Sequence, residues 1–338
     1  MKGQHSQISY IVRSLSRNRE KRYLLLCKMQ YSLILLGAVV VHLILCREFV
    51  TSLRMSSYAQ SRARNLMRMV ATDRETPSQP HLNTRHNPMT EKFEVISFHH
   101  LEFYCGDATS TYKRFMNGLG LDLTAKSDQS TGNKAHASYL LESNEVKMIF
   151  TAPYRQASPE ESKTKSIPSF SQDIACDFFD KHGLGVRAVA IEVGDVKDAF
   201  GVIISNGGVE IMAPTTMEDE NGMGSLDIAE VALYGDVSLR LINSRNFKGK
   251  GLPNFKMVNE DKPNIGQGKF GLYRFDHVVG NLHDLQATMA RVKSLTGFHE
   301  FAEFDAEDVG TVDSGLNSVV MASNNQKVCF RFVPLFLF

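Results

Sequence analysis

The residue of this sequence best placed to do chemistry is a histidine inside a short strand-like segment. In LYRFDHVV (residues 272–279), alternation puts Tyr273, Phe275 and His277 on one face. A neutral imidazole held by a rigid strand can bind Fe(II). Non-haem iron oxygenases combine two such histidines with one carboxylate, which leaves positions for substrate and O2. One histidine does not specify a metal, so an ordinary core role for His277 stays open.

Candidate partners for this histidine are few. Asp276 directly precedes His277. Because neighbours in a strand point to opposite faces, its side chain is expected to point away from His277, at the edge of the strand or supporting a ligand without contacting the metal. Carboxylates follow farther along, but nothing in the pattern selects among Glu300, Glu303 and Asp305. His99 and His100 are also adjacent in a predicted strand. Their imidazoles should face apart, which favours a structural role over a shared metal ion.

Longer strings on both sides of this strand resemble the plant-type 4-hydroxyphenylpyruvate dioxygenases. Downstream they are FDHVVGN (275–281), TGFHEFAEF (296–304), and residues 314–318 and 322–324. Upstream they are FHHLEFYCGDA (98–108), residues 125–128 and 130–133, FTAPY (150–154) and HGLGVRAVA (182–190). The resemblance covers residues 93–328, and such long strings are far more specific than a short motif.

The resemblance implies a fold and an activity. The fold is α+β, of the vicinal-oxygen-chelate type with repeated βαβββ modules. The activity is that of an oxidoreductase that uses Fe(II) to convert 4-hydroxyphenylpyruvate and O2 to homogentisate and CO2. This reaction belongs to tyrosine catabolism and supplies precursors of plastoquinone and tocopherol. A related mandelate-forming activity shares the fold and the iron site, and nothing before Phe338 separates the two.

The resemblance also implies roles for three residues. His277 is the first iron ligand, and Ser318 and Val279 line the substrate pocket. The family's second histidine and its glutamate lie in a C-terminal part that this chain does not reach, and the family pattern breaks after Val328. The chain is therefore expected to be inactive alone.

The elements that must position these residues recur in the order strand, helix, strands, in units that begin near residues 96, 186 and 272. Such units pack in pairs into one partly closed barrel, because a lone half-sheet leaves an apolar face in water. The predicted domains are a first barrel (93–243), a connector (244–271) and an incomplete iron-binding domain (272–338). The third unit is expected as a strand-helix-strand half. The resemblance implies a homo-oligomer formed through the first barrel.

Residues 1–92 are predicted to be a basic leader and linker. Residues 1–72 contain twelve Lys or Arg against two Glu, which leaves a +10 leader before a −9 body. Residues 29–46 carry no formal charge and are just long enough to span a bilayer. Three interpretations stay open: a membrane anchor, part of an organelle-targeting leader, and a mistaken start site.

Several features favour a cytoplasmic protein over a membrane-anchored one. The resemblance implies a protein of the cytosol, or alternatively of the plastid, without a transmembrane helix. Five cysteines with no close pair indicate a reducing compartment. The basic run lacks interleaved aromatic residues, which argues against nucleic-acid binding. Two other functions stay open: a non-enzymatic fragment that pairs with an intact homologue, and a membrane-tethered binding protein.

Overall fold

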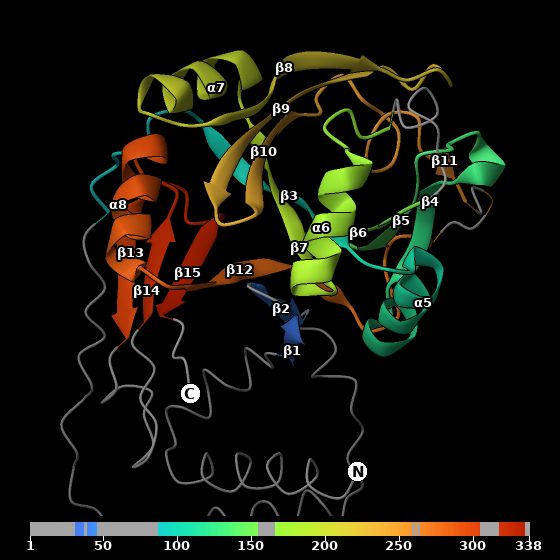
Figure 1. Ribbon diagram of the computed structural model, residues 1–338, viewed down its shortest axis with the longest axis horizontal. Helices are drawn as coiled ribbons and strands as arrows, with labels where there is room; N and C mark the ends of the chain where they lie inside the picture. The colour runs from blue at the N-terminus through green and yellow to red at the C-terminus, as the bar shows by residue number, and fades with distance from the viewer. Residues whose placement is uncertain are drawn as a thin grey trace, which may run out of the picture.

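The computed structural model describes residues Tyr31–Leu36, Val39–Leu45, 87–154, 166–258, 261, 264–304 and 318–334. Three successive βαβββ units make up the body of the chain (Figure 1). The first two units build a nine-stranded sheet, and the third builds most of a six-stranded sheet. The α+β class predicted from the sequence is confirmed.

The first two units are joined through their first strands. The first unit comprises β3 (Val95–Tyr104), α5 (Ala108–Leu119), β4 (Asp122–Ser127), η2 (Gln129–Thr131), β5 (His136–Ser143) and β6 (Val146–Pro153). The second comprises β7 (Gly185–Val193), α7 (Val196–Ser205), β8 (Glu210–Glu218), β9 (Ser225–Tyr234) and β10 (Val237–Asn243). Strands β3 and β7 pair antiparallel, and the sheet runs β11-β4-β5-β6-β3-β7-β10-β9-β8, with β11 (Lys256–Met257) at one edge.

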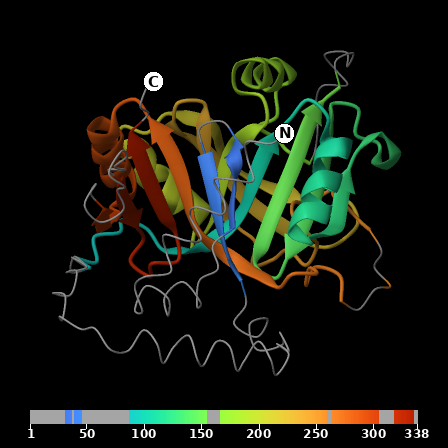
Figure 2. The same cartoon turned by 90° about the horizontal axis from the view of Figure 1, so that it is seen from below.

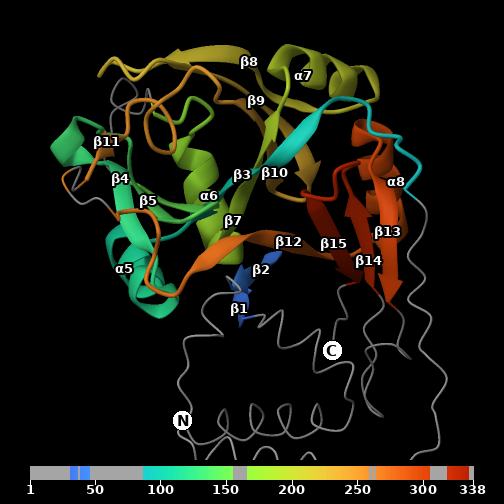
Figure 3. The same ribbon diagram turned by 180° about the vertical axis from the view of Figure 1, so that it is seen from behind.

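The third unit is fuller than the half that the sequence predicted. It comprises β12 (Leu272–Leu282), α8 (Leu285–Thr296), β13 (His299–Phe304), β14 (Ser318–Ala322) and β15 (Cys329–Pro334), and Figure 3 shows α8 beside these last strands. The segment after Val328 forms β15, which pairs with β12 and β14. Phe330 and Phe332 alternate along it, are buried and stack on each other, so two-residue periodicity accounts for the strand.

The uncharged N-terminal segment forms two strands in its described part. Strands β1 (Tyr31–Leu36) and β2 (Val39–Leu45) pair antiparallel, and β2 extends the third unit's sheet beside β12 (Figure 2). The run of three valines that opens β2 favours a strand. Among the described residues, no helix is long and apolar enough to cross a membrane.

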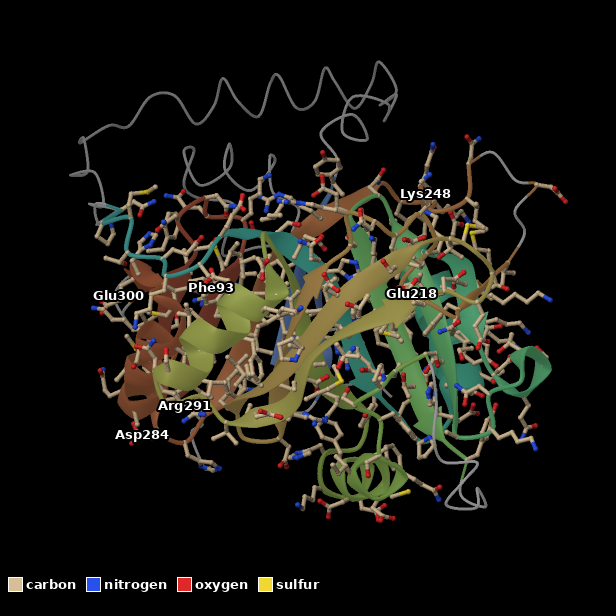
Figure 4. The ribbon with its side chains drawn as sticks, turned by 90° about the horizontal axis from the view of Figure 1, so that it is seen from above. Phe93, Glu218, Lys248, Asp284, Arg291 and Glu300 are labelled. Atoms are coloured by element: carbon tan, nitrogen blue, oxygen red, sulfur yellow. The ribbon has the colours of Figure 1, made fainter. Side chains whose placement is uncertain are left out.

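The helix of each unit begins at an aspartate. The carboxylates of Asp107, Asp195 and Asp284 accept hydrogen bonds from backbone N–H groups in the first turns of α5, α7 and α8. Figure 4 shows Asp284 at the start of α8. These N-caps fix the residue at which each helix begins after the first strand of its unit.

Both faces of the nine-stranded sheet are covered. Helix α6 (Gln172–His182) lies within the curve of the sheet, where Phe178 packs edge-on against Tyr104 (Figure 1). On the other face, Phe98 makes edge contacts with Phe275 and Phe330, with ring centroids 6.0 and 6.2 Å apart. These aromatic contacts dock the third unit on the first barrel.

Candidate functional site

The three predicted site residues share one face of the third unit's sheet. His277 and Val279 lie two residues apart on β12, and Val279 is in register with Arg331 on β15. The Nε of Arg331 donates a hydrogen bond to Ser318 Oγ on β14, at 2.9 Å. The register and this bond bring His277, Val279 and Ser318 to the same side of three neighbouring strands, where all three are buried.

Asp276 contacts the imidazole of His277, so the prediction that it faces the other way is wrong. Oδ2 of Asp276 lies 3.0 Å from Nδ1 of His277. Where β12 pairs with β2, its register shifts between Phe275 and His277, and this bulge interrupts strict alternation. A carboxylate only accepts, so Nδ1 of His277 donates the proton of this bond, which fixes the orientation of the ring.

Arg331 is a candidate site residue that the sequence analysis missed. It is partly buried, and burial lowers the pKa of its guanidinium. It places a positive charge beside Ser318, on the face that carries His277. A guanidinium can bind a ligand carboxylate through two parallel hydrogen bonds. The alternation in CFRFVP (329–334) could have predicted this strand and with it the position of Arg331. The segment was not recognised because it departs from the family pattern.

The described residues do not assemble a three-ligand iron site. In the ranges given above, no group of three or more His, Cys, Asp or Glu side chains could hold a metal ion. Glu300 lies on β13, three strands from β12. The side chain of Glu303 and the whole of Asp305 lie outside the described residues.

The adjacent histidines of the first barrel also contact each other. The Nδ1 atoms of His99 and His100 lie 2.7 Å apart, where the register of β3 against β7 shifts between Phe98 and His100. The expectation that these imidazoles face apart is therefore wrong, again because of a bulge. Burial lowers the pKa of both, and the charges of Arg240 and Lys147 add to this effect, so both imidazoles are neutral.

Solved structures share this fold. A triple mutant of 4-hydroxymandelate synthase from Streptomyces coelicolor matches with a TM-score of 0.56 at 16% identity, covering 71% of this chain and 63% of that one. A fusion of a xylose isomerase-like TIM barrel with 4-hydroxyphenylpyruvate dioxygenase matches with a TM-score of 0.50 at 17% identity, covering 82% and 37%. The repeated βαβββ units and these neighbours define the vicinal-oxygen-chelate fold.

Sequence relatives specify the family further. The 4-hydroxyphenylpyruvate dioxygenase of Daucus carota is 48% identical over 244 residues, which cover 72% of this chain and 54% of that protein. That of Plectranthus scutellarioides is 49% identical over 247 residues, covering 73% and 55%. No family model matches the chain. The chain spans about half the length of the curated relatives it matches, and over the matched residues it is a homologue of the plant 4-hydroxyphenylpyruvate dioxygenases.

Proposed function

We propose that this chain takes part in the oxidation of 4-hydroxyphenylpyruvate by O2 to homogentisate and CO2. The observation that carries the proposal is the imidazole of His277, held on β12 by Asp276 at 3.0 Å within a fold shared with the dioxygenases. In this proposal His277 is one protein ligand of Fe(II). The hydrogen bond from Nδ1 orients the ring and increases the basicity of Nε2.

The remaining side chains of this face suit the substrate. 4-Hydroxyphenylpyruvate carries a carboxylate at one end and an aromatic ring at the other. In this proposal Arg331 binds the carboxylate, Ser318 holds the guanidinium through its 2.9 Å hydrogen bond, and Val279 forms an apolar wall. These roles use charge and shape that the described residues provide.

The 338-residue chain by itself is proposed not to catalyse this reaction. The described residues supply one imidazole in place of three protein ligands, and one imidazole binds iron weakly. The second candidate function is therefore a non-enzymatic partner of an intact homologue, and the finding that the described residues form no three-ligand group favours it. The first barrel offers an edge for such pairing, since β8 ends the sheet and exposes Ile211, with the exposed Val209 just before it.

Homogentisate formation tests the proposal. The purified chain would be incubated with 4-hydroxyphenylpyruvate, O2 and Fe(II), beside a His277→Ala control and a mixture with an intact plant homologue. We expect no turnover by the chain alone and co-elution with the homologue in size-exclusion chromatography. Iron-dependent turnover abolished by His277→Ala would show that the chain completes its own iron site. A chain that neither turns over, nor binds 4-hydroxyphenylpyruvate in calorimetry, nor co-elutes has no part in this reaction.

A further inference from the structure

A second histidine of the third unit is buried without a hydrogen-bond partner for its ring. His299 is the first residue of β13 and is only 3% exposed. Among the residues that the structure describes, neither Nδ1 nor Nε2 of this imidazole has a hydrogen-bond partner. An unpaired polar group in the interior loses its bonds to water and gains none in return, so a buried ring of this kind requires an explanation.

The strand register places His299 on the face that carries the candidate site. His299 is in register with Ala322 on β14, and Ala322 is in register with Cys329 on β15. The parallel pairing of β12 with β15 puts His277 beside Cys329, one position before the first residues in register. Register partners lie on the same face of a sheet. The two imidazoles therefore lie at opposite ends of one row that crosses four neighbouring strands (Figure 3).

Small apolar side chains form the floor of this face beside His299. Ala322 and Cys329 follow His299 along the row, and Val320 lies two residues from Ala322 on the same face of β14. The side chains of Val320, Ala322 and Cys329 form a buried apolar cluster of their own, against which Phe301 packs. An apolar floor without large side chains suits the flat face of an aromatic ring.

The length of this face matches the proposed substrate. Ser318, which holds the guanidinium of Arg331, lies four residues from Ala322 on β14, a distance of about 13 Å along the strand. His299 lies one strand farther across, which puts the two ends about 14 Å apart. 4-Hydroxyphenylpyruvate measures about 8 Å from its carboxylate carbon to its phenol oxygen, and a hydrogen bond at each end adds about 3 Å. A molecule bound by its carboxylate at Arg331 therefore brings its phenol hydroxyl to His299.

The protonation state of His299 suits a phenol. Burial lowers the pKa of His299, so the ring is neutral at pH 7. A neutral imidazole has one N–H donor and one acceptor nitrogen, and a phenol hydroxyl can pair with either of them. A ligand whose ring lacks the hydroxyl would leave both nitrogens unpaired, so this contact would distinguish the two ligands.

We propose that His299 binds the ring hydroxyl of the substrate and thereby selects 4-hydroxyphenylpyruvate over phenylpyruvate. This inference rests on the proposed function, because it assigns the far end of the same site. Arg331 binds the carboxylate, the apolar cluster supports the aromatic ring, and His299 pairs with the hydroxyl. The specificity for a hydroxylated ring then depends on one side chain that takes no part in binding the carboxylate.

Calorimetry of the full chain with 4-hydroxyphenylpyruvate and with phenylpyruvate tests this role. The unmodified chain is expected to bind 4-hydroxyphenylpyruvate at least about ten-fold more tightly than phenylpyruvate. His299→Leu should remove this preference by weakening the binding of 4-hydroxyphenylpyruvate alone. His299→Gln keeps a donor and an acceptor and should restore part of the preference. The matched control is Arg331→Lys, which should weaken both ligands by the same factor and keep the preference.

The outcomes separate this role from the proposed function. Equal binding of both ligands by the unmodified chain, or a preference that persists in His299→Leu, would overturn the role of His299 and leave the proposed function standing. A chain that binds neither ligand would count against the proposed substrate site, and the role of His299 would fall with it.

Urea unfolding of the ligand-free chain distinguishes a ligand-binding imidazole from a structural one. Because the ring nitrogens have no hydrogen-bond partner among the described residues, His299→Leu should keep the urea midpoint of the unmodified chain or raise it. A lower midpoint, or a His299→Leu chain that does not fold, would show that the imidazole serves the fold and would overturn the proposal.

Discussion

Replacing His136 with glutamine is expected to make the protein less sensitive to acid. His136 is fully buried on β5, with Nδ1 2.8 Å from Ser138 Oγ and the ring 4.5 Å from that of Phe170. The Asn133 amide nitrogen donates to Nε2 at 3.1 Å, because its Oδ1 accepts from the backbone of Ala135. Burial lowers the pKa of His136 to about 3. A proton on Nε2 would also face the Asn133 donor, so the folded protein keeps this imidazole neutral.

The magnitude follows from the difference between the folded and unfolded pKa values. The unfolded value is about 6.5. Because the folded pKa is lower, the unfolded chain binds the extra proton, and stability falls as the pH drops below 6.5. The pKa of His136 falls from about 6.5 in the unfolded chain to about 3 in the folded protein. This difference lowers the unfolding free energy by about 2 kcal/mol when the pH falls from 7.5 to 5. His136→Gln removes this titration and leaves the other histidines unchanged.

Urea unfolding at pH 7.5 and pH 5 would measure the effect. On acidification, His136→Gln should lose about 2 kcal/mol less unfolding free energy than the unmodified chain. The matched control is His283→Gln, because His283 is exposed just after β12 and its replacement should leave the acid-induced loss unchanged. Equal losses in all three proteins would refute the argument that His136 is held neutral by burial.

Three further predictions concern the third unit. Phe330→Ala should lower the unfolding free energy by about 3–5 kcal/mol in urea, because this buried ring packs against Phe98; a loss below about 1 kcal/mol would contradict the packing of β15. Gly280→Ala should cost about 1–3 kcal/mol, because a Cβ there would lie 2.7 Å from the hydroxyl oxygen of Tyr234. Adding Tyr234→Phe should recover part of that loss, and no recovery would count against the close approach. Asp276→Asn should weaken Co2+ binding at His277 by about 10- to 100-fold in a titration, and unchanged affinity would exclude an orienting role for the carboxylate.

Local sequence signals predicted most of the elements. Asp195, which opens the helix of the second unit, and Gly297, which follows the helix of the third, mark these two ends as the sequence predicts. Gly118 does not end the first helix, which continues to Leu119. Two-residue alternation placed the strands of the first two units. It also predicted one face for Tyr273, Phe275 and His277, but a bulge between Phe275 and His277 interrupts this alternation. These features depend on interactions within a few residues, which a sequence displays directly.

The contacts that the sequence did not predict depend on partners far along the chain. The bulge beside His277 arises from pairing with β2, and the bulge beside His100 from pairing with β7. Alternation assumes a strand without a bulge. It therefore predicted that each histidine and the neighbour that it contacts would lie on opposite faces of the strand. Arg331 was missed for a similar reason, since β15 is recognised through its pairing with β12 and β14.

Anaerobic titration of the chain with Fe(II) tests the central claim most directly, namely that His277 is an iron ligand on a scaffold whose described residues supply one imidazole for the metal. We expect weak binding of one Fe(II) per chain, which His277→Ala abolishes. Binding that is unchanged in His277→Ala would show that His277 is not a ligand. Tight binding by the unmodified chain would contradict this, because the chain would then supply further ligands beside His277.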